Sequence, residues 1–218
     1  GTGFGASLTV TIYIDAVPIT SASTSTNGSF SVYLYVPQGT SGYHTVTATD
    51  TSLNTASTTY IIIPTISINP SSVTGGSQVT ISGNSFGAST TVTIYIDSVA
   101  VTSALTNASG SFTVYLTVPQ GTGRYHTVNV TDSLGNTAST TYNIISSVTL
   151  TPSSASVGAQ ITINGTAFAA NATVTIYIDS VAVTSASTNT VGSFTYNLTV
   201  PQNVGGSHTV TITDSMGN

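Results

Sequence analysis

The stretch TVTIYID occurs three times, at residues 9–15, 91–97 and 173–179, and it decides the fold class. Successive copies lie 82 residues apart. In each copy Val and Ile alternate with Thr and Tyr, so the apolar side chains share one face of an extended strand. A fixed period of this length indicates domains in series. The sequence therefore predicts a tandem array built from β-strands that are buried on one face.

The second repeat predicts a complete set of seven short strands. Gly, Pro, Asn and Asp separate the strands, as turn residues do, and no segment has a helical period. We therefore expect one antiparallel β-sandwich for each repeat. The expected strands cover residues 65–69, 78–82, 91–96, 99–103, 111–118, 124–131 and 137–145.

The two ends of the sequence fall inside repeats. GTGFGAS at residue 1 matches GNSFGAS at residue 83, and the final TDSMGN matches TDSLGN at 131–136. We expect residues 1–64 to be a repeat without its first two strands, 65–146 a complete repeat, and 147–218 a repeat without its last strand. Either the sequence is a window on a longer array, or neighbouring chains supply the strands by complementation. Unfilled sheet edges would otherwise promote aggregation.

The composition argues against several classes of protein. Only 3% of residues are charged, against ~25% in ordinary domains. Arg124 is the one Lys or Arg, so the chain cannot neutralise a run of phosphates or bind anionic lipid through a basic patch. Mean hydropathy is +0.31, yet apolar residues alternate with Thr and Ser, which argues against membrane insertion. Cysteine is absent, so there are no disulfides or thiolate sites.

No grouping of residues predicts catalysis. His44, His126 and His208 occupy one repeat position and lie in different domains, where we interpret them as structural residues beside Tyr43 or Tyr125. The Gly-rich stretches lack the Lys of a phosphate loop, and no nucleophile elbow is present. We expect no enzyme activity, no catalytic residues and no cofactor.

The aspartates allow a weak metal hypothesis. Asp97 and Asp132 fall in turns at opposite ends of one sandwich, too far apart for acid–base work. Where one domain meets the next, Asp15 would approach Asp132, and Asp97 would approach Asp214, which gives candidate interdomain calcium sites. The alternative is that each Asp accepts N–H groups within its own turn.

The sequons and the outward tyrosines are surface features. Asn129 and Asn197 are expected on outward strand positions, and Asn107 and Asn171 in turns. N-linked glycans would give this nearly uncharged chain a hydrophilic coat and would imply export. Outward Tyr residues of the TVTIYID strands could stack on sugars, pack against a neighbouring chain, or only favour strand formation. The candidate glycosylation sites are Asn27, Asn107, Asn129, Asn164, Asn171 and Asn197, and the outward tyrosines are Tyr13, Tyr95 and Tyr177.

The later repeats resemble a known family. Residues 68–97 and 150–179 have a Pro after the first strand, a Gly before the second, and a G-x-x-F turn before the third. This pattern is similar to IPT/TIG immunoglobulin-like domains. The resemblance implies an all-β fold of three tandem immunoglobulin-like antiparallel β-sandwiches. Family members serve as receptor modules, adhesin stalks, enzyme appendages and dimerisation domains, and the basic residues of DNA-binding members are missing here. The matching residues are Pro70, Gly76, Gly83, Phe86, Pro152, Gly158, Gly165 and Phe168.

The expected function is structural. The sequence favours a subunit or segment of an extracellular surface filament or stalk, glycosylated and joined head to tail. Its partners would be other copies of itself or adjacent repeats of a longer chain. The low-charge, Cys-free, Thr- and Ser-rich style resembles archaeal surface-filament proteins. The alternative is an adhesin or carbohydrate-binding module of a cell-surface protein, and an enzyme accessory segment comes third.

Overall fold

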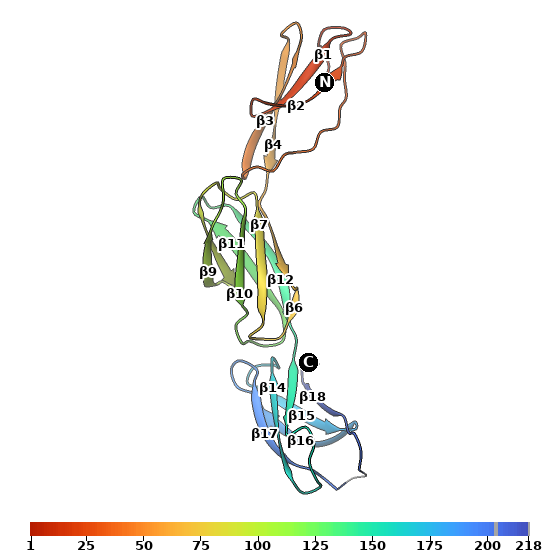
Figure 1. Cartoon of the computed structure of the whole chain (residues 1–218), viewed down its shortest axis with the longest axis vertical. Coiled ribbons are helices and arrows are strands. Elements are labelled where there is room, and N and C mark those ends of the chain that lie inside the picture. The colour runs from red at the N-terminus through yellow and green to blue at the C-terminus, as the bar shows by residue number, and fades with distance from the viewer. Residues whose placement is uncertain (203–204, 218) are drawn as a thin grey trace.

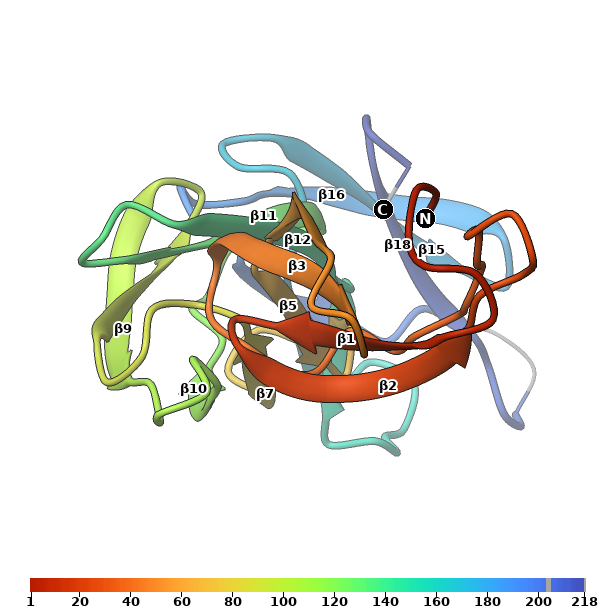
Figure 2. The same ribbon diagram turned by 90° about the horizontal axis from the view of Figure 1, so that it is seen from above.

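Three β-rich units follow one another along the molecule. The computed structural model describes residues 1–202 and 205–217, and no helix occurs among them. Figure 1 shows the units in line along the longest axis, and the view from above in Figure 2 shows them stacked in one column. The predicted all-β class is confirmed. The strands fall within residues 1–64, 65–146 and 147–218.

The second repeat forms a complete two-sheet sandwich. One sheet has the order β10-β7-β5 and the other β6-β12-β11-β8-β9. All neighbours are antiparallel except β6 and β12. The seven predicted strands are present, and β6 is an addition too short for the sequence pattern to reveal. The strands are β5 (Thr65–Asn69), β6 (Ser72–Val73), β7 (Gln78–Asn84), β8 (Thr91–Ile96), β9 (Val99–Leu105), β10 (Phe112–Thr117), β11 (Arg124–Asp132) and β12 (Thr137–Ile144).

A two-residue turn closes the hairpin between β8 and β9, as the sequence predicts. Asp97 and Ser98 have φ angles of 46° and 70°. Both values lie in the left-handed region, which matches the turn to the right-handed twist of the flanking strands. Aspartate tolerates this conformation better than most side chains. The equivalent pairs in the other repeats have the same geometry.

The core of the second repeat lies between its two sheets. Val92 and Ile94 have no exposed surface, and Phe86 of the G-x-x-F turn is also fully buried. The Phe112 ring packs edge-on to the Phe86 ring, with centroids 5.6 Å apart. It also covers Gly83, where an added Cβ would lie 2.2 Å from Phe112 Cε1. The motif glycine is therefore required because an aromatic ring lies where a side chain would be.

The first repeat has a single sheet, ordered β2-β1-β3-β4. Residues 30–35, whose equivalents form β10 in the second repeat, do not form a strand. The strand that pairs with β10 is β7, and the first repeat has no equivalent of it among its described residues. The side chains of Tyr33 and Tyr35 are accordingly 100% and 97% exposed. The strands are β1 (Thr9–Ile14), β2 (Val17–Ser23), β3 (Gly42–Asp50) and β4 (Thr55–Ile62).

The third repeat has both sheets, but within its described residues nothing occupies the place of β12. Its sheets are ordered β13-β14-β17 and β16-β15-β18. Strand β18 has 5 residues, whereas the equivalent β11 has 9. The missing residues are those at the start of the strand. In the second repeat, the equivalent start of β11 pairs with β12 and not with β8. The strands are β13 (Ser147–Thr151), β14 (Gln160–Thr166), β15 (Thr173–Ile178), β16 (Val181–Ser187), β17 (Phe194–Thr199) and β18 (Val210–Asp214).

We predict that equivalent core substitutions differ in cost between repeats. Phe112→Ala removes a side chain that is only 6% exposed and should lower the free energy of unfolding of the second repeat by about 3–5 kcal/mol. Phe30→Ala is the matched control, and it should cost much less because Phe30 is half-buried. Hydrogen exchange at increasing denaturant concentration reports the free energy of unfolding of each repeat separately, and it measures both changes. Equal losses would contradict this account of the core.

Candidate functional site

Each repeat holds a His–Asp pair that the sequence analysis did not identify. The Nδ1 to Oδ2 distance is 2.5 Å for His44 and Asp15, and 2.6 Å for His126 and Asp97. The third repeat repeats this pair at 2.6 Å. Antiparallel pairing of β8 with β11 brings the end of one strand to the start of the other. The His and Asp residues recur with the same 82-residue period, which suggests a shared role. Only the register of the paired strands shows that their side chains are in contact.

Both ring nitrogens of the histidine are engaged. In the first repeat, Nε2 of His44 lies 2.8 Å from the carbonyl oxygen of Thr40, while Nδ1 faces Asp15. A carbonyl and a carboxylate only accept hydrogen bonds, so both nitrogens must donate. The geometry fits an imidazolium ion held between two acceptors. In this arrangement neither nitrogen is left to accept a proton, and the pair joins the start of one strand to the turn after another.

The histidine rings pack against a tyrosine from the last strand. The His126 and Tyr142 centroids are 5.6 Å apart, and the two residues face each other on β11 and β12. The first repeat has the same contact between His44 and Tyr60. The expectation that Tyr125 would be the neighbour is wrong. Adjacent residues of a strand point to opposite faces, and Tyr125 is 79% exposed.

These contacts shift the pKa values of the pair. The hydrogen bond to Asp15, and then that to the Thr40 carbonyl, raise the pKa of His44 above its usual value. Hydrogen bonds from His44 and the Thr45 N–H lower the pKa of Asp15. Burial raises the pKa of Tyr142 to about 12, with a smaller contribution from the charge of Asp97. Tyr142 is thus held neutral beside the His126–Asp97 pair.

The second set of aspartates braces the hairpin turns. Asp132 is 3% exposed, and its Oδ2 accepts the Gly87 N–H and the Asn136 side-chain amide, each at 2.8 Å. Its Oδ1 accepts the N–H groups of Leu134 and Asn136 at 2.9 Å. One buried carboxylate therefore links the hairpin to the loop before β8. Asp50 makes the same set of bonds in the first repeat.

The candidate calcium residues are thus engaged by groups of the protein. Asp15 and Asp97 accept from a histidine and a backbone N–H, and Asp132 and Asp214 accept N–H groups of their loops. Asp97 and Asp132 lie at opposite ends of β8, as expected. Among residues 1–202 and 205–217, no three metal-ligating side chains come together. The geometry accords with the turn-bracing alternative, and interdomain calcium binding stays a prediction.

The sequons differ in accessibility. Five of the six asparagines are exposed, and Asn129 points outward from β11 as expected. Asn164 is half-buried in β14, and its Oδ1 accepts the Thr195 hydroxyl at 2.8 Å. Asn164 is therefore the least accessible of the six sequon asparagines. The exposed sequon residues are Asn27, Asn107, Asn129, Asn171 and Asn197.

The outward tyrosines of the TVTIYID strands are less exposed than the sequence suggests. Tyr13, Tyr95 and Tyr177 are half-buried on the outer faces of their sheets. Other tyrosines are more exposed, among them Tyr43 and Tyr125, which are 80% and 79% exposed at equivalent positions of two repeats. Strand alternation indicates an outward direction but does not show what lies beside it.

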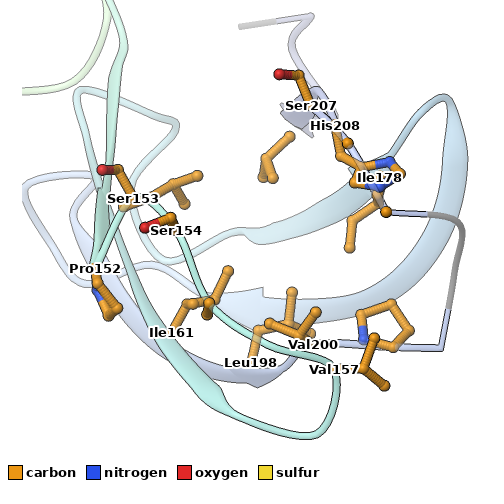
Figure 3. Close-up of a pocket in the computed structure, with 16 residues that line it drawn as sticks. Pro152, Ser153, Ser154, Val157, Ile161, Ile178, Leu198, Val200, Ser207 and His208 are labelled. Carbon is orange, nitrogen blue, oxygen red and sulfur yellow. The ribbon is translucent and has the colours of Figure 1, made fainter.

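The third repeat contains an open apolar groove of about 420 Å³ (Figure 3). Ile161, Leu198 and Val200 line one side, and Ile178 and His208 lie across from them. In the second repeat the equivalent space is filled by β12, whose Tyr142 and Ile144 are 1% and 2% exposed. The groove is therefore the unfilled part of a sandwich core.

Residues that line this groove are more exposed than their equivalents in the second repeat. Val118 and Val128 of the second repeat are 1% and 0% exposed. Their equivalents, Val200 and Val210, are only half-buried. The side chains are the same, and in the second repeat β12 and β6 fill positions that hold no strand among the described residues of the third repeat. The wall of the groove therefore consists of residues whose equivalents belong to the core of the second repeat.

The first repeat has a second opening, of about 340 Å³, on the inner face of its sheet. Phe4, Ile12, Leu34 and Val46 contribute to its lining. In the second repeat, β7, the middle strand of the β10-β7-β5 sheet, covers this part of the core. The two terminal units thus expose complementary parts of the same core.

The connections between the units are short and direct. Two residues separate β4 from β5, and two separate β12 from β13. At the first junction the Gln38 side-chain amide donates to Asn84 Oδ1 at 3.2 Å and Ser111 Oγ at 2.6 Å. At the second junction the Arg124 guanidinium donates to the carbonyl of Met216. Polar contacts therefore tie each unit to the next.

No helix long and apolar enough to cross a membrane occurs in the part of the chain that the structure describes.

Comparisons with known proteins identify a domain family. The family model described as IPT/TIG domain matches residues 62–144 and 143–216. A search of curated proteins gives no match. Motif residues Gly83 and Phe86, which carry the resemblance in the sequence, are those that the core packing requires. The match therefore agrees with both sequence and structure.

Several solved structures are similar in fold. A tetra-tandem repeat from the extending region of a large adhesion protein is 22% identical, covers 100% of this chain and 66% of its own, and has a TM-score of 0.36. A Bacteroides ovatus mixed-linkage glucan utilization protein is 16% identical, with 97% and 56% coverage and a TM-score of 0.30. A Ca²⁺-stabilized adhesin of an Antarctic bacterium is 19% identical, with 99% and 66% coverage and a TM-score of 0.25. The chain spans less than two thirds of these proteins, and TM-scores this low carry no functional argument.

The His–Asp pair predicts a pH dependence of stability. Because the pKa of folded His44 is raised above 6.5, its contribution is complete below that value and is lost as the pH rises through the raised pKa. The contribution of Asp15 is present above 3.8 and is lost as the pH falls through its lowered pKa. Thermal unfolding between about pH 5 and pH 9 should show the first loss. His44→Gln should flatten the slope, and an unchanged slope in that variant would contradict the assignment.

Proposed function

Because the chain belongs to the IPT/TIG domain family, we propose that it is a structural segment of an extracellular surface filament or stalk. The repeats act as rigid links in series, each stabilised by its own core and joined to the next by a short connection. In such an array each module contacts only its neighbours, and the length of the whole scales with repeat number. The function is mechanical extension.

The observation that supports this proposal most strongly is the end-to-end arrangement of the three units (Figure 1). Two-residue connections leave little freedom between sandwiches. The contacts of Gln38 and Arg124 act at the two junctions. The His–Asp pairs and the braced hairpins recur in every unit, so the repeated sequence preserves the rigidity of each link.

Head-to-tail assembly by strand complementation is part of the proposal. The first unit exposes the core face that β7 covers in the second repeat, and the third exposes the face that β12 covers. Neighbouring repeats, from another copy or from a longer chain, would provide those strands. Completing each sandwich would remove the exposed sheet edges and bury the groove walls.

Export and glycosylation complete the proposal. Five accessible sequons lie on outer surfaces of a chain with 3% charged residues. Sugar would supply the hydration that charged side chains provide in ordinary proteins. These features favour a location at the cell surface.

A second candidate function is carbohydrate binding by an adhesin. The observation that favours it is the pair of exposed rings of Tyr43 and Tyr125, because flat aromatic surfaces stack on sugars. Their equivalent places in two successive repeats would suit a ligand that spans more than one repeat. Glycan-array binding that is lost in Tyr43→Ala and Tyr125→Ala would favour this function.

The mass of the native material before and after deglycosylation tests the structural proposal. We expect a ladder of sugar mass above the 22.0 kDa polypeptide, or a longer polypeptide that contains these repeats. Electron microscopy should show linear assemblies. A bare monomer of 22.0 kDa that forms no assembly would contradict the filament proposal.

We also predict which sequons are used. In a glycosylating host, Asn129→Gln should remove one sugar mass step because Asn129 is exposed on β11. Asn164→Gln is the matched control and should leave the mass unchanged, since Asn164 is half-buried and hydrogen-bonded to Thr195. Intact-mass spectrometry reads both results. Sugar at Asn164 but not at Asn129 would contradict the accessibility argument.

A further inference from the structure

We propose that the groove of the third repeat is an acceptor site for a β-strand with the pattern of β12, Thr137–Ile144. This inference rests on the proposed structural role and extends it by naming the occupant and its register. The occupant is an extended peptide segment with an inward-pointing tyrosine followed two residues later by an inward-pointing isoleucine. It would lie antiparallel to β18 and complete that sheet.

The second repeat shows how such a strand is held. On β12, Tyr142 and Ile144 point inward and belong to the core. In the ladder with β11, Tyr142 lies opposite His126 and Ile144 lies opposite Arg124. Ala138 packs against the core further along the strand. The strand therefore contributes every second side chain to the space between the sheets.

The same register applied to the third repeat places each side chain in the groove. The tyrosine falls opposite His208 and the isoleucine opposite Gly206, both of which line the cavity. The tyrosine ring would then lie beside the imidazole that Asp179 holds at 2.6 Å, as it does in the other repeats. The isoleucine would cover Leu198 and Val200 (Figure 3). A cavity of about 420 Å³ accommodates side chains of this size.

The backbone beside the groove has room for another strand. Within the described residues, β18 pairs only with β15. Residues 206–209 are not in a strand, although their equivalents 124–127 form the start of β11. Those equivalents pair with β12 and not with β8. An added strand would supply that ladder, whose main-chain hydrogen bonds give affinity while the pockets give specificity.

The lining favours a strand over a sugar. Its side chains are mainly those of Leu, Ile, Val, Pro and Ser, and none of the lining residues is Tyr, Phe or Trp. Sugar sites depend on aromatic stacking, which this groove does not offer. An apolar wall beside an unpaired strand is the surface that β-augmentation uses.

The test is binding of a synthetic peptide with the sequence of residues 137–145, TASTTYNII, to the chain of residues 1–218. We expect saturable binding together with slowed hydrogen exchange at residues 206–209. Residues 30–35 are the internal control, and their exchange rates should not change. Their equivalents in the second repeat form β10, which pairs with β7 and not with β12. Residues 124–127 should be protected with or without peptide.

Two variant peptides test the register. Replacement of the tyrosine or of the isoleucine by alanine should each weaken binding roughly tenfold, since each removes a buried apolar side chain. Replacement of the outward threonine equivalent to Thr141 should change affinity little, because Thr141 is exposed on β12. Val200→Ser in the acceptor should also weaken binding while leaving the second repeat unchanged.

Absence of binding, equal binding of a scrambled peptide, or protection of residues 30–35 in place of 206–209 would overturn the inference. Such a result would leave the array proposal standing, because mass and microscopy test it independently. Conversely, specific peptide binding by a chain whose native form is a bare monomer would support the acceptor site and contradict the filament.

Discussion

A β-strand persists only where a neighbouring strand completes its hydrogen bonds, and the rest of this structure depends on that constraint. The sequence SFTVYLTV at 111–118 contains β10, paired with β7. The nearly identical SFSVYLYV at 29–36 forms no strand in the first repeat, which has no described equivalent of β7. The start of β11 is likewise a strand, whereas residues 206–209, which share only its His and Thr, form none. One repeat sequence thus gives two local structures, according to what lies beside it.

The same constraint connects structure to assembly. An isolated sheet exposes both its edge and its inner face, and the third repeat shows the effect on side chains, because Val200 and Val210 lose the burial of Val118 and Val128. In the proposed assembly, an added strand would complete both the hydrogen-bonded ladder and the core. The His–Asp pairs and buried aspartates instead act inside each unit. In the proposed array, the contacts inside each unit would therefore be distinct from the strands that join one unit to the next.

Much of the fold could be predicted from sequence, because alternation and turn residues are local signals. The seven strands of the second repeat and the Asp97–Ser98 turn follow from them. The pairing of His126 with Asp97 and Tyr142 could not be predicted this way, since it depends on strand register. The unpaired state of residues 30–35 was equally hidden, because their pattern matches that of a true strand.

Hydrogen exchange of the free chain, resolved to single amides, tests the central claim most directly. Residues 112–117 and residues 30–35 have nearly the same sequence, so their intrinsic exchange rates are close and only the structure separates them. The account predicts strong protection across 112–117, where β10 pairs with β7, and little at 30–35. Equal protection of the two segments would show that strand formation here does not depend on a neighbour, and the account would fail.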